Sequence, residues 1–194
     1  MNLKERVYQH FTDSIQTQHD SLDALSEPIE VASQAITQSL LNNGKIISAG
    51  NGGSAALAQN FSSQMINPFE RERPSLPAIT LSTNSATLTS ISNDHSYSDV
   101  FSKQLRALGQ QGDIFLAYST SGNSSNIIEA IHTAHDRGLT TIALTGKDGG
   151  QISTLLQDED IELRVPSNSG LRIQETHLLM THCLCNLIDF QLFG

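Results

Sequence analysis

The sequence predicts an α/β protein, a three-layer sandwich in which a five-stranded parallel sheet is flanked by helices. From about residue 45 onward, short and nearly continuous apolar runs alternate with segments of helical spacing, which is the pattern of a parallel sheet covered on both faces. Two polar turns each follow such a run and open a helical segment. The length of 194 residues suits one domain with a core that needs no metal or disulfide.

Two N-terminal helices are expected before the first strand. Apolar residues recur at helical spacing in residues 3–25 and again in residues 29–41. Between them, Glu27 and Pro28 are expected to end one helix and begin the next, since proline is tolerated in a first turn. We therefore expect a single domain over residues 1–194. In it, residues 1–43 form helices used in oligomer packing and residues 44–194 form the α/β core.

The core is expected to alternate strands and helices in order. The apolar runs place strands at residues 45–49, 78–81, 114–118, 141–144 and 161–165. The helices between them are expected at residues 54–65, 86–92, 98–108, 124–137 and 151–156. A last apolar-striped helix carries the chain to its end.

The turn from Ser119 to Ser124 has the chemistry of an anion site. It follows the apolar run of residues 114–118 and precedes a helical segment, so unpaired N–H groups, the helix dipole and several hydroxyls could meet one phosphate. The alternative is an ordinary Ser/Asn-capped helix. A second such turn, residues 50–54, favours the anion site. Because parallel strands bind ligands at their carboxyl ends, both turns are expected to share one pocket.

Composition excludes several classes of partner. The net charge of −9 and the isoelectric point near 5.1 argue against direct binding to nucleic acid or to an anionic membrane. The two cysteines, Cys183 and Cys185, would point to different faces of a helix and are expected to stay reduced. With no targeting or membrane-spanning segment apparent, we expect a cytoplasmic protein.

Four motifs in order resemble the sugar isomerase (SIS) fold in its phosphoheptose isomerase branch. They are residues 50–54, 119–124, 144–150 and 172–175. The resemblance implies a homotetramer whose pockets are built from several subunits and bind sedoheptulose 7-phosphate. It implies that the phosphate is held by Ser54, Ser119, Thr120, Ser121 and Ser124. The full set of implied ligand-binding residues is Asn51, Gly52, Gly53, Ser54, Asn93, Asp94, Ser119, Thr120, Ser121, Ser124 and Gln174.

The same resemblance implies that the catalytic machinery is degenerate. Catalytic members carry a histidine and a glutamate after the first turn, and a glutamine and a histidine on the last helix, which together bind zinc. The corresponding positions here hold Asn60, Gln64, Gln174 and His182. Amides cannot act as general bases and are poor zinc ligands. We therefore expect no intact catalytic set and no cofactor, with zinc expected only if the protein is an isomerase.

Several side chains near these motifs have more than one possible role. His182 and His177 are expected to be structural, each satisfied by a carbonyl or hydroxyl near the core. Asp94 or Glu175 could replace the missing base, although Glu175 is expected to pair with Arg172 or with a neighbouring subunit.

Further segments resemble DiaA-like proteins, a non-catalytic group of the SIS family. These segments are residues 14–18, 65–67, 72–79, 183–185 and 187–189. The resemblance implies a homotetramer that binds the replication initiator DnaA and promotes its assembly at the chromosomal origin. It assigns partner binding to Leu192 and Phe193, which could instead pack on their own subunit. The alternative function is that of a phosphoheptose isomerase, which converts sedoheptulose 7-phosphate to D-glycero-D-manno-heptose 7-phosphate.

Overall fold

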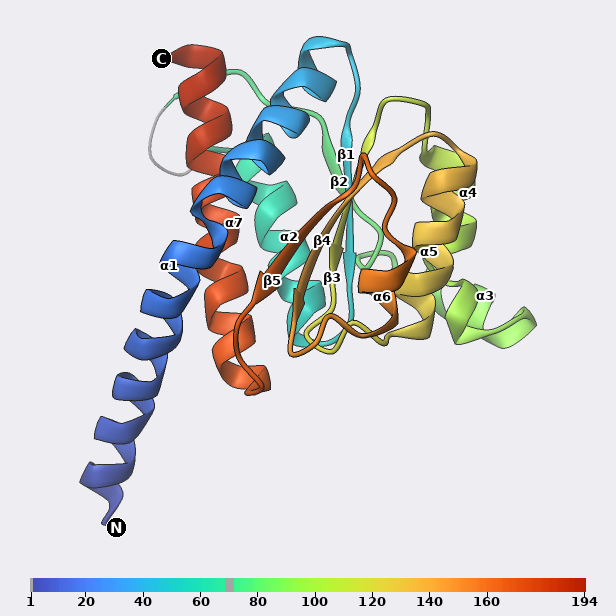
Figure 1. The fold of residues 1–194 in the computed structure, drawn as a ribbon. Helices are drawn as coiled ribbons and strands as arrows, with labels where there is room; N and C mark the ends of the chain where they lie inside the picture. The colour runs from blue at the N-terminus through green and yellow to red at the C-terminus, as the bar shows by residue number, and fades with distance from the viewer. Residues whose placement is uncertain (1, 69–71) are drawn as a thin grey trace.

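The computed structural model describes residues 2–68 and 72–194. Its centre is a five-stranded sheet (Figure 1), and every pair of neighbouring strands is parallel. The strands are β1 (Ile46–Gly50), β2 (Ala78–Thr80), β3 (Ile114–Tyr118), β4 (Thr140–Gly146) and β5 (Ile161–Val165), in the order β2-β1-β3-β4-β5. The predicted fold class is confirmed.

Helices cover both faces of this sheet. One face carries α1 (Leu3–Leu41), α2 (Gly53–Ile66) and α7 (Gly170–Phe193), and the other carries α4 (Ser102–Leu108), α5 (Ser125–Asp136) and α6 (Gly150–Leu155). The short helix α3 (Ser85–Asp94) and the 3₁₀ turn η1 (Tyr97–Asp99) lie on the α4–α5 side. Successive strand residues alternate between the two layers, so Ile46 and Ile47 belong to different apolar cores.

The strand order has a switch point between β1 and β3. After β1 the chain passes to the edge strand β2 and then returns to β3, which pairs with the other side of β1. Gly50 at the end of β1 lies opposite Tyr118 at the end of β3. In open parallel sheets this position is where ligands bind, because the two connections diverge and leave a crevice.

The expectation of two N-terminal helices is wrong. The segment forms one helix of 39 residues, α1, with Pro28 inside it. A proline within a helix costs about 3 kcal/mol. Here Leu25 and Ala32 are buried in the same apolar core on either side of Pro28, so breaking the helix would remove one of them from that core. Tertiary packing therefore keeps the helix continuous.

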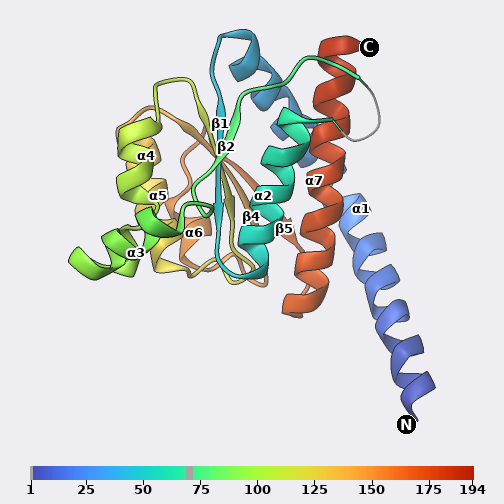
Figure 2. The same ribbon diagram turned by 180° about the vertical axis from the view of Figure 1, so that it is seen from behind.

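The N-terminal half of α1 extends away from the body of the molecule (Figures 1 and 2). Its start is fixed by a capping box, in which Asn2 and Glu5 each accept a hydrogen bond from the other's backbone N–H. Large apolar side chains along this half are exposed, at Leu3, Val7, Tyr8, Phe11, Ile15 and Leu22.

Two further observations bear on the surroundings of the chain. Throughout residues 2–68 and 72–194, the helices all fall short of the length and apolarity needed to cross a membrane. Cys183 and Cys185, both on α7, are free, as expected.

His177 of α7 is a structural residue of the core, as expected. It is fully buried, its Nε2–H donates to the Thr145 carbonyl at 2.9 Å, and its ring meets that of Tyr118 edge to face. Its Nδ1 has no hydrogen-bond partner among the described residues. Burial disfavours the charged imidazole and lowers the pKa of His177 to about 4.

This pKa predicts that acid destabilises the fold. Between pH 6.5 and pH 4 the unfolded chain binds a proton at His177 that the folded chain does not, so the free energy of unfolding should fall by about 3 kcal/mol. In His177→Gln, which keeps a donor for Thr145, this part of the pH dependence should disappear. Urea unfolding of both proteins across this pH range measures it, and equal pH slopes would contradict the assignment.

Candidate functional site

The first polar turn leads from β1 into α2. Asn51 and Gly52 connect the strand to the helix, and Ser54 lies buried in the first turn of α2. The N-cap residue of α2 is Gly52, which has no side chain to bond the first N–H groups of the helix. The N–H groups of Ser54 and Ala55 donate to the carbonyls of Asn51 and Gly52. The Ser54 hydroxyl stands at the positive end of the helix, where anions are stabilised.

The second turn leads from β3 into α5. Ser119 follows the strand and is buried, whereas Thr120, Ser121 and Ser124 are half-buried. Ser124 is the N-cap residue of α5, yet its side chain makes no capping hydrogen bond. Instead, its Oγ lies 3.1 Å from the Oγ of Ser119. The alternative of an ordinary serine-capped helix therefore does not describe this turn, whose hydroxyls face each other across the strand-to-helix junction.

A reciprocal pair of amides joins the two turns. Asn51 Nδ2 donates to Asn126 Oδ1 at 2.8 Å, and Asn126 Nδ2 donates back to Asn51 Oδ1 at 2.9 Å. The Tyr97 hydroxyl donates to the same Asn51 oxygen at 3.1 Å. Sequence reasoning missed Asn126 and Tyr97. The sequence shows Asn126 only as an asparagine near the start of a helical segment. Its pairing with Asn51 could be predicted only if β1 and β3 were known to be neighbours.

Gln174 of α7 also reaches the first turn. A Cβ atom added at Gly53 would lie 2.7 Å from Gln174 Nε2, so the glycine allows this amide to approach the start of α2. The structure thus places Gln174 beside Gly53, one of the residues with which it was predicted to bind a ligand.

Asn93 and Asp94 lie at the end of α3 and hydrogen-bond to each other, with Asn93 Nδ2 donating to Asp94 Oδ1 at 2.9 Å. In the described part of the chain, neither side chain hydrogen-bonds to the two turns. Glu175 accepts from Arg172 at 2.7 Å and from Ser14 at 2.8 Å. The expected pairing of Glu175 with Arg172 is present, and it ties α7 to α1.

A cavity of about 770 Å³ between α2 and α7 contains the remaining predicted positions. Asn60, Gln64 and His182 line it, and Gln64 Nε2 donates to Asn60 Oδ1 at 2.7 Å. His182 is exposed, so its expected role as a satisfied histidine near the core is wrong. The reason is helical phase: His177, Thr181 and Leu184 form the buried stripe of α7, and His182 lies off that stripe.

These residues do not fit a zinc ion. The predicted positions in the cavity offer one imidazole beside two neutral amides, and the Asn60 oxygen already accepts a hydrogen bond from Gln64. Of the other possible ligands that line the cavity, Asp189 is held in an ion pair with Arg73, and burial raises the pKa of the Cys183 and Cys185 thiols. Gln174 stands eight residues before His182 on α7, about 12 Å along the helix axis. Over the described ranges, no three His, Cys, Asp or Glu side chains are grouped as metal ligands. Zinc in proteins is held by thiolate, imidazole and carboxylate ligands, so no step of the chemistry is derived through it.

The C-terminal residues belong to α7. Leu192 is partly buried and packs against the apolar core of its own chain, and the exposed fraction of Phe193 is 36%. Leu192 therefore packs on its own subunit, which was the alternative to a role in partner binding.

Known proteins resemble the chain over its whole length. A family model described as SIS domain matches residues 9–146. The phosphoheptose isomerase of Chromohalobacter salexigens is 57% identical over 100% of this chain and 98% of its own. The phosphoheptose isomerase of Coxiella burnetii is 56% identical over 99% of this chain and 96% of its own.

Solved structures agree with this relationship. The phosphoheptose isomerase GmhA of Neisseria gonorrhoeae has a TM-score of 0.93 and 46% identity, covering 97% of this chain and 100% of its own. A phosphoheptose isomerase from Francisella tularensis has a TM-score of 0.96 and 44% identity, covering 98% and 100%.

These names correct the expected function. The similar full-length proteins are called phosphoheptose isomerases, and neither they nor the structure support DnaA binding through Leu192 and Phe193. The chain belongs to the SIS-domain family, within its phosphoheptose isomerase branch.

Proposed function

We propose that this protein is a phosphoheptose isomerase, which converts sedoheptulose 7-phosphate to D-glycero-D-manno-heptose 7-phosphate. The observation that carries the proposal is the 57% identity, over the whole chain, to a protein of that name. The two hydroxyl-rich turns, joined by Asn51 and Asn126, support it because such a substrate needs an anion site.

The turns supply an anchor for the 7-phosphate. The hydroxyls of Ser54, Ser119, Thr120, Ser121 and Ser124 donate hydrogen bonds to the phosphate oxygens, and the N-termini of α2 and α5 stabilise its charge. The phosphate is at the opposite end of the heptose from C1 and C2. An anchor there fixes the sugar without crowding the carbons that react.

The reaction moves a proton between C1 and C2 through an enediol, and this requires a group that can both accept and donate a proton. In this proposal that group is the exposed imidazole of His182. Asn60 and Gln64 hydrogen-bond to the sugar's hydroxyls or carbonyl oxygen but cannot carry the proton. Asp189, which also lines the cavity, is held in an ion pair with Arg73 at 2.6 Å.

We also propose that the protein is a homotetramer in which α1 docks on other copies. Phe11 and Ile15 belong to the exposed apolar stripe on the projecting half of α1. An apolar groove of about 320 Å³ between α1 and α7 is lined by Leu22, Leu25 and Leu179 among others. Burying such a stripe against a second copy removes it from water. A second copy could also bring its α2–α7 cavity to this chain's phosphate turns.

The isomerase proposal predicts turnover by metal-stripped protein. Sedoheptulose 7-phosphate should be converted in the presence of a chelator, and His182→Ala should lower kcat by about a hundredfold or more. His132→Ala, at an exposed histidine of α5, is the matched control and should retain full activity. Binding of the substrate without any turnover would contradict the proposal, as would full activity in His182→Ala.

If the site binds no metal, placing a histidine and a glutamate at residues 60 and 64 should create affinity for zinc. The purified protein should hold no stoichiometric zinc, and Asn60→His/Gln64→Glu should bind it more tightly because a carboxylate and an imidazole one helical turn apart face the same side. Metal content after dialysis measures this. In the control, Asn60→His/Gln59→Glu, the carboxylate points elsewhere and should add no affinity. Stoichiometric zinc in the unaltered protein would refute the assignment.

The docking role of α1 predicts an assembly larger than the 21.0 kDa chain. Light scattering after size exclusion should give about four times that mass, and Phe11→Asp should lower it because a charge would be buried in the interface. Thr12→Asp places the same charge on the neighbouring exposed position and should leave the mass unchanged. A monomeric unaltered protein would disprove the proposal.

A further inference from the structure

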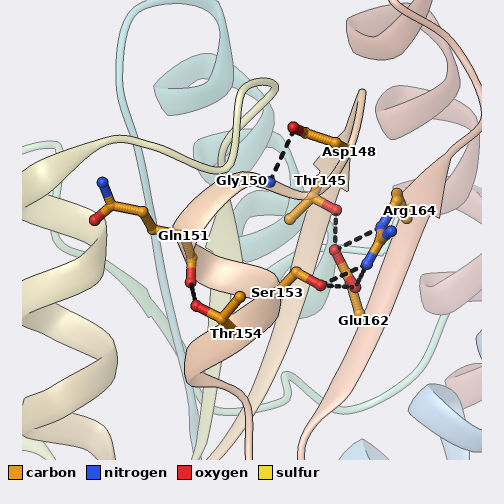
Figure 3. A network of polar contacts seen from close by, with 8 residues as sticks. All are labelled: Thr145, Asp148, Gly150, Gln151, Ser153, Thr154, Glu162 and Arg164. Carbon is orange, nitrogen blue, oxygen red and sulfur yellow. Dashed lines mark hydrogen bonds and ion pairs between the residues drawn. The ribbon is translucent and has the colours of Figure 1, made fainter.

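A charged network lies beneath the turn that follows β4 (Figure 3). Arg164 of β5 donates to both carboxylate oxygens of Glu162, with its Nε 3.0 Å from Oε1. Glu162 Oε1 also accepts from the Thr145 hydroxyl at 2.6 Å. Ser153 of α6 donates to Glu162 Oε2 at 3.2 Å and accepts from Arg164 at 2.5 Å. One carboxylate of β5 therefore joins β4 to α6.

The charge of Glu162 is stabilised where it lies. The exposed fraction of its side chain is 17%, against 39% for Arg164. Burial alone would raise the pKa of Glu162, but hydrogen bonds from Arg164 and Thr145 outweigh this and lower the pKa below its ordinary value. The carboxylate remains ionised, and both of its oxygens accept hydrogen bonds from these partners.

The network is attached to the core on one side. The backbone carbonyl of Thr145 accepts the hydrogen bond from the buried His177, and Thr145 is itself fully buried. Its position is therefore set by the packing of α7 on the sheet.

On the other side, α6 contacts the phosphate turn directly. The N–H of Ile152 donates to the Gly122 carbonyl at 2.9 Å, and the N–H of Gln151 donates to Asn123 Oδ1 at 3.0 Å. A Cβ atom at Gly122 would lie 1.8 Å from the Gly149 carbonyl oxygen, and Gly122 has a φ of +65°. The turn from Ser119 to Ser124 is therefore packed closely against Gly149 and hydrogen-bonded to α6.

We propose that Glu162 and Arg164 are positioning residues for the phosphate turn, acting through Ser153 and α6 on Gly122 and Asn123. The identity of the ligand, a phosphorylated sugar, rests on the proposed function. Neither residue belongs to the turns that hold the phosphate, so their effect is on the geometry of the turn. A change here should weaken binding of the phosphorylated sugar and leave the proton-transfer step unaltered.

The test compares Glu162→Gln with the unaltered protein by calorimetry, kinetics and hydrogen exchange. Glu162→Gln should raise Kd and KM for sedoheptulose 7-phosphate about tenfold, with kcat within twofold. Amide exchange should become faster at residues 119–124. Arg164→Lys, which keeps the charge but loses the fork of two donors, should show a smaller effect in the same direction and serves if Glu162→Gln folds poorly.

The control is Lys45→Met, which removes a different ion pair. Lys45 Nζ lies 2.6 Å from Asp113, near the start of β1 and so at the opposite edge of the sheet. Lys45→Met should lower the Tm without altering Kd for the sugar phosphate or amide exchange in the phosphate turn. Unchanged exchange at residues 119–124 in Glu162→Gln would overturn the positioning role. Failure of the unaltered protein to bind sedoheptulose 7-phosphate would instead overturn the proposed function, and the exchange comparison would still decide the role of the network.

Discussion

The pairing of Asn51 with Asn126 is the contact on which the candidate site depends. Parallel pairing of β1 with β3 sets the ends of the two strands side by side, and the reciprocal amide hydrogen bonds then hold the first turn against the start of α5. Each turn alone is a strand-to-helix junction of a common kind. Together they place several hydroxyls and two helix N-termini at the switch point of the sheet, and this combination makes an anion site.

The candidate anion site and the cavity residues occupy different parts of the protein. The phosphate turns lie at the carboxyl edge of the sheet, whereas Asn60, Gln64 and His182 line a cavity between α2 and α7. Gln174, on the same helix as His182, lies beside Gly53 of the first turn. The amides of Asn60 and Gln64 carry no charge and are poor zinc ligands.

Local patterns predicted most of the fold, because buried parallel strands are short apolar runs and turn residues mark their ends. The predictions of a helix break at Pro28 and of a His182 side chain near the core were wrong, because both features depend on packing between distant elements. The partnership of Asn51 with Asn126 joins residues 75 positions apart and has no local signal. The predicted binding of DnaA was wrong for a different reason: the segments on which it rested are short, whereas the similarity to phosphoheptose isomerases spans the whole chain.

A crystal structure of the protein with sedoheptulose 7-phosphate tests the central claim most directly. We expect the phosphate group to lie between the turns, within hydrogen-bond distance of the hydroxyls of Ser54, Ser119 and Ser124. The sugar should be directed toward a cavity that contains Asn60, Gln64 and His182. A phosphate bound only within the α2–α7 cavity, with the two turns empty, would contradict it.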